Sequence, residues 1–129
     1  MATNQKKIRD DMLRWYEAFN ARDVSRLDQL ADEMYDDTFI LHDPGFPNFE
    51  QGPNGVKQFV RQVFKDNSAI SLTVDDVLGE GDKLAVRFTV RSTNAATGKV
   101  VHFPVLSIAH YAGDKVVEEW ELAGPPEEE

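Results

Sequence analysis

The chain has 129 residues, of which 41% are hydrophobic and 29% are charged, and it contains no cysteine. This length suits a single domain with one buried core, and the composition is that of a globular protein. With 14 basic and 23 acidic residues the net charge is −9, which argues against nucleic acid and anionic membranes as partners. The absence of cysteine excludes disulfides, thiol nucleophiles and cysteine-ligated metals. The first residues form no apolar signal core, so we expect a cytoplasmic protein.

Two helices are expected at the start of the chain. Apolar residues recur at helical spacing over residues 5–21, after Thr3 or Asn4 as the capping residue. A second helical pattern follows Asp23, a favourable N-cap, and its apolar stripe extends to Tyr35. Both patterns are amphipathic, so each helix should pack one face against a core.

A short strand and a third helix come next. Residues 38–43 are expected to form the strand, which stops at His42-Asp43-Pro44 because proline cannot continue a ladder. Pro53 suits the first turn of a helix, and the apolar stripe behind it includes Phe59.

The second half of the chain changes to a period of two. Alternating runs separated by short Gly-containing turns predict an antiparallel meander over residues 70–74, 84–90, 100–111 and 116–122. Helices followed by strands indicate an α+β domain, with three helices laid on one face of a curved sheet that leaves a conical cavity. We expect one domain over residues 1–123 and a disordered acidic tail over residues 124–129.

The order of these elements and several local strings resemble the nuclear transport factor 2-like superfamily, especially its SnoaL-like polyketide cyclase and ketosteroid isomerase branches. The strings are WYEAFNARDVSRLDQLADEMYDDTFILHDP, GPNGVKQFVRQVF, GEGDKLAVRFTVRST and HYAGDKVVEEW, and the resemblance covers residues 8–122. It implies a cone-shaped α+β barrel that forms a homodimer. It also implies a cofactor-free enzyme that transfers protons on a small hydrophobic carbonyl compound, as an isomerase or a cyclase.

Asp43 is the leading candidate for the catalytic base. In the ketosteroid isomerases a strand ends in Glu-Asp-Pro, whose Asp carries the proton, and His42-Asp43-Pro44 occupies the matching place. The alternative is a loop carboxylate that caps the backbone of residues 45–46. Strand alternation sends His42 to the opposite face, which favours a surface or interface imidazole. If the strand has already ended there, His42 faces the pocket, so it is kept as a candidate substrate-binding residue.

Those isomerases stabilise the reacting oxygen with a Tyr and a protonated Asp, and this chain differs at both places. Trp15 stands where the Tyr is expected, and Ser107 stands where the Asp is expected. An indole N–H and a hydroxyl both donate hydrogen bonds, but neither is a strong acid. Tyr16, one residue away, is an alternative donor.

A glutamate on the last strand is a second candidate for proton transfer. The resemblance points Glu119 inward, near Ser107, where burial would raise its pKa. Alternation places Glu121 on the same face as Glu119, and Glu118 with Trp120 on the other. A register error of one residue would give the role to Glu118, and a purely structural role as an edge charge is the remaining alternative.

The walls of the expected pocket should be apolar, with Phe59, Phe88, Phe103 and Val105 as substrate contacts. The scattered histidines show no zinc-site spacing, so no metal is expected. Two other functions stay open: a hydrolase or dehydratase of the same fold, and a ligand-binding or dimerising module without catalysis. A pKa-shifted carboxylate in a closed pocket would favour an enzyme, and a pocket filled by its own aromatic side chains would favour the module.

Overall fold

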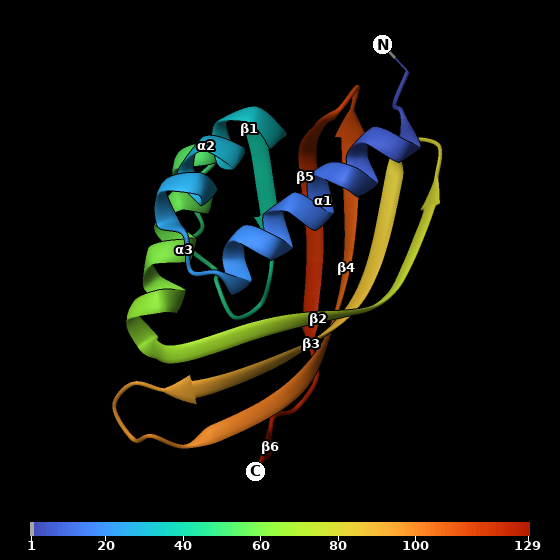
Figure 1. The fold of residues 1–129 in the computed structure, drawn as a ribbon. Helices are drawn as coiled ribbons and strands as arrows, with labels where there is room; N and C mark the ends of the chain where they lie inside the picture. Colours follow the sequence, from blue (N-terminus) through green and yellow to red (C-terminus); the bar gives the residue numbers. More distant parts are fainter. Residues whose placement is uncertain (1) are drawn as a thin grey trace.

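The computed structural model of the protein describes residues 2–129. Figure 1 shows three helices beside a strongly curved sheet, as predicted for an α+β fold. In chain order the elements are α1 (Gln5–Asn20), α2 (Val24–Met34), β1 (Tyr35–His42), α3 (Pro53–Asp66), β2 (Asn67–Glu80), β3 (Lys83–Asn94), β4 (Val100–Ala112), β5 (Lys115–Ala123) and β6 (Glu127–Glu128). Within residues 2–129, every helix is too short or too polar to traverse a lipid bilayer.

The first two helices begin at capping residues that the sequence predicts. The Asn4 side chain accepts a hydrogen bond from the Lys7 backbone N–H at 3.1 Å. Asp23 does the same for the backbone N–H of Arg26 at 3.0 Å. Each cap satisfies a donor that the first helical turn leaves free, which fixes where the helix begins.

Strand β1 is longer than its sequence pattern indicates. Tyr35, which was expected on the stripe of the second helix, is the first residue of β1, and it pairs with Val116 of β5. Pairing with a distant strand therefore overrides the local helical pattern at this position. Figure 1 shows the result, in which the chain turns directly from α2 into β1.

A glycine fixes the entry to α3. Gly52 has a φ of 85°, a value that favours glycine, and its N–H donates to the Phe39 carbonyl at 2.8 Å. A Cβ on Gly52 would lie 2.9 Å from the Asp37 carbonyl oxygen, so a side chain there would force β1 and the loop apart. The predicted role of Pro53 in the first turn of α3 is confirmed.

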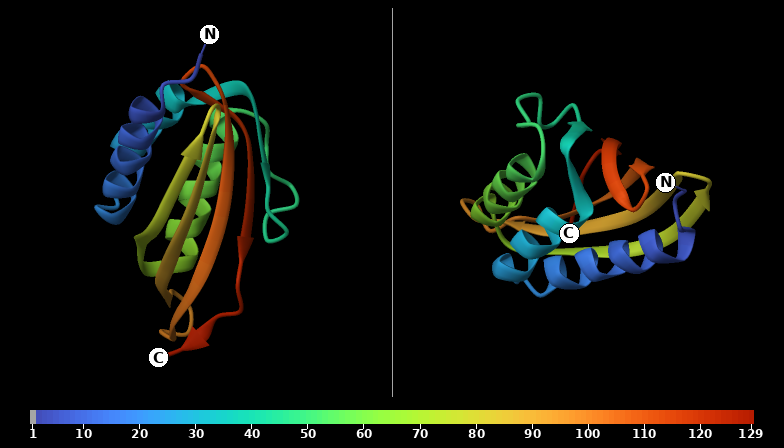
Figure 2. Two further views of the ribbon diagram at one scale, coloured as in Figure 1. Left: turned by 90° about the vertical axis from the view of Figure 1, so that its right-hand side faces the viewer. Right: turned by 90° about the horizontal axis from the view of Figure 1, so that it is seen from above.

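The sheet has the strand order β1-β5-β4-β3-β2 and is mainly antiparallel, with β1 parallel to β5. The two views in Figure 2 show how strongly the long strands β2, β3 and β4 bend. At the β2 edge, Asn20 of α1 exchanges two hydrogen bonds with the backbone of Leu72, which blunts the free edge.

Two apolar clusters hold the layers together. One lies between α1 and the concave face of the sheet, and the other lies among the three helices. Fully buried side chains of the clusters are Ile8, Leu27, Leu30, Phe39, Val60 and Leu84. The curvature of the sheet leaves part of the space between these clusters unfilled.

The C-terminal tail, which the sequence predicts to be disordered, includes a short strand in this structure. The Gly124 N–H donates to the Pro104 carbonyl at 2.8 Å, and β6 then pairs with β4, Glu127 opposite His102. Pro125 and Pro126 interrupt the ladder because they lack an N–H, but pairing resumes after them. The acidic end also has partners that sequence reasoning did not find, in Arg91, Lys99 and His102.

Candidate active site

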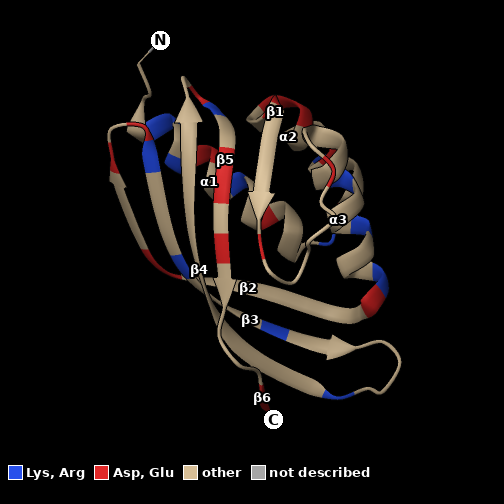
Figure 3. Ribbon diagram, turned by 180° about the vertical axis from the view of Figure 1, so that it is seen from behind, with Lys and Arg blue, Asp and Glu red and all other residues tan. Residues whose placement is uncertain are grey.

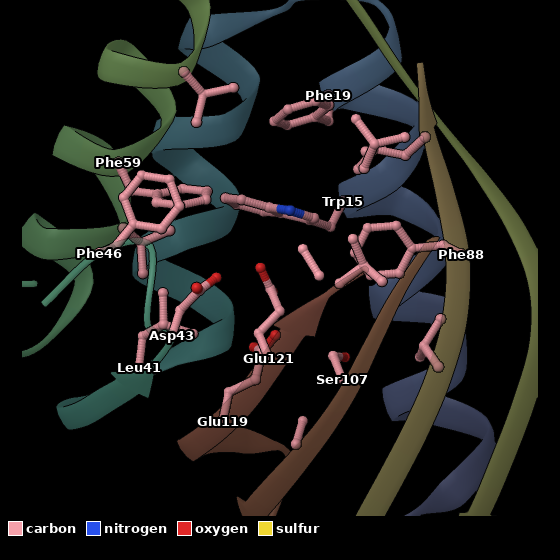
Figure 4. A pocket seen from close by; sticks show the side chains of 18 of the residues that line it. Trp15, Phe19, Leu41, Asp43, Phe46, Phe59, Phe88, Ser107, Glu119 and Glu121 are labelled. Carbon is pink, nitrogen blue, oxygen red and sulfur yellow. The ribbon is translucent and has the colours of Figure 1, made fainter. Parts of the chain in front are cut away.

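A cavity of about 480 Å³ lies between the helices and the concave face of the sheet. Its walls are mostly aromatic and aliphatic, as Figure 4 shows. Every predicted site residue except His42 lines it, namely Trp15, Tyr16, Asp43, Phe59, Phe88, Phe103, Val105, Ser107 and Glu119. The aromatic side chains of the walls leave this volume unfilled, so the cavity has room for a ligand.

Three carboxylates meet in this cavity, those of Asp43, Glu119 and Glu121. Figure 4 shows their side chains pointing toward one another. Parallel pairing of β1 with β5 sets Leu41 opposite Glu119, and alternation then brings Asp43, just after β1, to the same face. The convergence of Asp43 and Glu119 thus follows from the sheet register.

Asp43 has a structural role as well as a place in the cavity. Its Oδ1 accepts a hydrogen bond from the Gly45 N–H at 2.8 Å, and its carbonyl accepts one from the Phe46 N–H at 2.9 Å. This is the backbone capping that the sequence offered as an alternative to catalysis. Both features occur together, because the turn that the carboxylate caps also aims it at Glu121.

The two glutamates are held in an environment that opposes ionisation. Burial is the main cause that raises the pKa of Glu119 to about 7. The hydrogen bond with Glu121 lowers this pKa by a smaller amount, and the charge of Asp43 raises it further. Burial also raises the pKa of Glu121 well above its usual value, with further contributions from the charges of Glu119 and Asp43 and from hydrogen bonds to both. Glu121 therefore favours its protonated form beside Glu119 and Asp43.

Three tyrosines surround the carboxylates, one from each of α1, β1 and β4. They are Tyr16, Tyr35 and Tyr111, and all three line the cavity. Burial, followed by the charge of Glu119, raises the pKa of each tyrosine. The hydroxyls therefore stay protonated and are available as hydrogen-bond donors.

Ser107 lies on β4, directly opposite Glu121 in the register rather than opposite Glu119. Its side chain is only 6% exposed and lines the cavity. Its hydroxyl takes part in none of the side-chain hydrogen bonds found within residues 2–129, and because the residue lines the cavity this hydroxyl is available to a ligand. In Figure 4, Trp15 lies across the cavity from Ser107, so the two predicted donors face the same space.

His42 was included among the predicted substrate contacts, and the structure places it elsewhere. Its Nε2 lies 2.6 Å from an Oε2 of Glu118, and its ring stacks on Trp120 with 5.4 Å between the ring centroids. These three residues lie on the outer face of the sheet, because alternation separates them from Asp43 and Glu119. His42 is accordingly not a cavity residue.

Sequence reasoning did not select Glu121, Tyr35 or Tyr111 as site residues. For two of them, strand alternation in the sequence could have indicated a place in the cavity. Glu121 lies on the same face of β5 as Glu119, and Tyr111 lies on the same face of β4 as Ser107. Tyr35 carried no such signal, because its sequence pattern was helical.

The sequence matches the SnoaL-like domain family over residues 12–119. No match was found among curated proteins. Among solved structures, TsrD from Streptomyces laurentii is 20% identical, with a TM-score of 0.79 and coverage of 93% of this chain and 90% of TsrD. IdmH from Streptomyces antibioticus, described as a proposed polyketide cyclase, is 21% identical, with a TM-score of 0.74 and coverage of 90% of this chain and 91% of IdmH. TerC, which was co-crystallised with polyporic acid, is 16% identical, with a TM-score of 0.72 and coverage of 89% of each chain.

At these identities the solved structures establish a shared fold. The family match spans most of the chain, and it agrees with the strings that suggested the resemblance. This chain belongs to the SnoaL-like domain family and has the nuclear transport factor 2-like fold.

Proposed function

We propose that the protein is a cofactor-free acid/base enzyme that moves a proton on a small hydrophobic carbonyl compound, as an isomerase or a cyclase. The observation that supports this most is the convergence of Asp43, Glu119 and Glu121 on an apolar cavity. Groups with perturbed pKa values in an apolar pocket are typical of catalytic sites. The likeness to IdmH and TerC, one described as a proposed cyclase and the other crystallised with a small molecule, agrees with this proposal.

Asp43 is the proposed base. It would take the proton from the carbon next to the carbonyl, so the C–H bond breaks, an O–H bond forms on Asp43, and the electron pair moves to the carbonyl oxygen. The N–H of Gly45 fixes the direction of the carboxylate without occupying both of its oxygens. Positioning of this kind is needed because proton transfer requires close approach of the two atoms.

Glu119 and Glu121 complete the proton path. A pKa of about 7 allows Glu119 to accept or release a proton near neutral pH. The raised pKa of Glu121 favours its protonated form, so its carboxyl would donate a proton to the substrate. Return to a different carbon gives isomerisation, and attack of the carbanion on a second carbonyl gives cyclisation.

The developing negative charge on the substrate oxygen also needs donors. The hydroxyls of Tyr16, Tyr35, Tyr111 and Ser107 and the indole N–H of Trp15 are available around the cavity. Donors held in place in an apolar site stabilise an oxyanion more strongly than water does. Where the isomerases use one Tyr and a protonated Asp, this chain offers three tyrosine hydroxyls, a serine hydroxyl and an indole N–H.

Exchange of α-protons for deuterium tests the proposal without knowledge of the natural substrate. The ketone 2-acetonaphthone would be incubated with the protein in D₂O, and loss of its methyl signal would be followed by proton NMR. We expect exchange above the buffer rate, and a decrease of roughly 10² to 10⁴-fold in Asp43→Asn. Glu118→Gln is the control, because it changes an acid of the neighbouring strand β5 whose side chain pairs with His42 on the opposite face of the sheet. Binding of the ketone with no exchange above the buffer rate would contradict catalysis and favour a ligand-binding module.

We also propose that the protein is a homodimer that associates through the outer face of the sheet. Five large apolar side chains of β1, β4 and β5 are 41–62% exposed there, namely Ile40, Leu106, Ile108, Trp120 and Leu122. Figure 3 shows the sheet from this side, with acidic residues gathered along β5. Apolar side chains gathered on one face are typical of an interface.

A further inference from the structure

We propose that the cavity binds a molecule that carries a positively charged nitrogen, such as a protonated amine, on an aromatic or other apolar body. This inference rests on the proposed function for the location of the substrate. It adds the charge of that substrate, which neither the family nor the related structures specify.

The charges around the cavity are all of one sign. Asp43, Glu119 and Glu121 line it, and among residues 2–129 no lysine, arginine or histidine does. Two basic side chains of α1, Lys7 and Arg14, are paired with Asp11 outside the cavity. A cluster of acids in an apolar site without a cation is unfavourable, and a bound cation would remove that cost.

A hydroxyl without a partner also points to a ligand. Ser107 is 6% exposed, lines the cavity opposite Glu121, and makes no side-chain hydrogen bond within residues 2–129. An ammonium group has three N–H donors and no acceptor, so carboxylates and a hydroxyl are its natural partners.

The aromatic walls suit the same class of ligand. Trp15 and Phe88 stand on the side of the cavity that faces Glu121 in Figure 4. The faces of aromatic rings attract cations, and the attraction is stronger where water is excluded. A metal ion fits less well, because no group of three or more possible ligands within residues 2–129 is arranged to hold one.

Binding should depend on pH, because the site must lose a proton to hold a cation well. The titratable groups that face the cluster come from α1, β1, the loop after β1, β4 and β5, and they are Tyr16, Tyr35, Asp43, Tyr111, Glu119 and Glu121. A nearby positive charge favours the ionised carboxylates, so binding of the amine should release a proton. The affinity for the amine should therefore increase from pH 6 to pH 8.

Three naphthalene derivatives that differ mainly in charge provide the test. The probes are 2-(aminomethyl)naphthalene, 2-naphthalenemethanol and 2-naphthoate, which are cationic, neutral and anionic at pH 7.5. Isothermal titration calorimetry in two buffers of different ionisation enthalpy gives both the affinity and the number of protons released. We expect the amine to bind at least about tenfold more tightly than the alcohol, which corresponds to about 1.4 kcal/mol. We expect 2-naphthoate to show no binding.

Two near-isosteric variants identify the source of the selectivity. Glu121→Gln should weaken binding of the amine by about tenfold and change binding of the alcohol by less than about twofold. Glu118→Gln, on the outer face, should leave both unchanged. Unchanged circular dichroism and melting profiles would confirm that each variant is folded.

The charge class and the proposed chemistry fail in different ways. If the alcohol binds as tightly as the amine, if 2-naphthoate binds, or if the amine fails to bind at 1 mM, the inference about charge is wrong. Exchange of 2-acetonaphthone protons would be unaffected by any of these results, so the acid/base proposal would stand. If the amine binds selectively but no ketone exchanges its protons, the inference about charge stands and the acid/base proposal is wrong.

Discussion

The clearest physical consequence of the site is that Glu119 destabilises the protein at neutral and alkaline pH. Burial raises its pKa from 4.5 to about 7. Between these two pH values the folded protein keeps the proton and the unfolded chain loses it, so the free energy of unfolding falls as pH rises. The difference between these two pKa values corresponds to roughly 3 kcal/mol at pH 8, and the cost is absent below about pH 4.5.

Replacement of Glu119 by Gln removes this cost, because the amide has nearly the same shape and does not ionise. We expect Glu119→Gln to be more stable than the wild type by up to about 3 kcal/mol at pH 8 and to match it near pH 5. Urea unfolding at pH 5, 6, 7 and 8, followed by tryptophan fluorescence, measures the difference directly. Carboxylates remote from Glu119 titrate in both proteins, so their contributions cancel, and the comparison measures Glu119 together with its effect on Glu121.

Parallel stability curves would refute the reasoning, because they would mean that Glu119 ionises as easily in the folded protein as in the unfolded chain. Glu118→Gln serves as the control on the same strand, since its side chain pairs with His42 on the outer face and should give no stabilisation at pH 8. If Glu119→Gln is more stable but catalyses less deuterium exchange of the ketone, Glu119 lowers stability and supports activity, as is common for residues of catalytic sites.

Three further predictions concern the base, the tail and the outer face. Asp43→Asn should reduce the rate of ketone α-proton exchange by roughly 10² to 10⁴-fold. His42→Ala should keep most of the activity, because the imidazole lies outside the cavity. Equal losses of activity in the two variants, measured by NMR, would contradict this prediction. Removal of residues 124–129 should lower the free energy of unfolding in urea by roughly 1–2 kcal/mol, because backbone hydrogen bonds to β4 are lost. An unchanged free energy of unfolding would show that β6 does not contribute to stability. Trp120→Glu should give a monomer of 14.6 kDa by light scattering while the wild type gives twice that mass; a monomeric wild type would overturn the proposed dimer.

The sequence was sufficient for the fold because its local signals agreed with one another. Caps at Asn4 and Asp23, the proline at the start of α3 and the period-two runs each specify a local structure, and the structure has all of them. The parallel contact of β1 with β5 carried no local signal, because pairing between distant strands depends on the whole sheet. The site was predicted less completely for the same reason.

Two differences show where local reasoning fails. The tail after Gly124 reads as disordered, since prolines and glutamates have no intrinsic tendency to form strands, yet the exposed edge of β4 provides partners for it. Glu121 was placed on the correct face by alternation, but its significance depends on Asp43, which lies far away in the chain. Predicting such a cluster requires the register between β1 and β5 as well as the parity of each strand.

The position of β1 in the sheet also determines when the site can exist during synthesis of the chain. Strands β2, β3 and β4 follow one another through short connections, so they can pair as soon as they leave the ribosome. Asp43 emerges early, whereas Glu119 and Glu121 belong to the last long strand. The mutual repulsion of the three acids therefore arises only after the meander is in place. A nascent chain that ends before β5 carries Asp43 but neither glutamate of the cavity, and this order spares the early folding steps the electrostatic cost of the cluster.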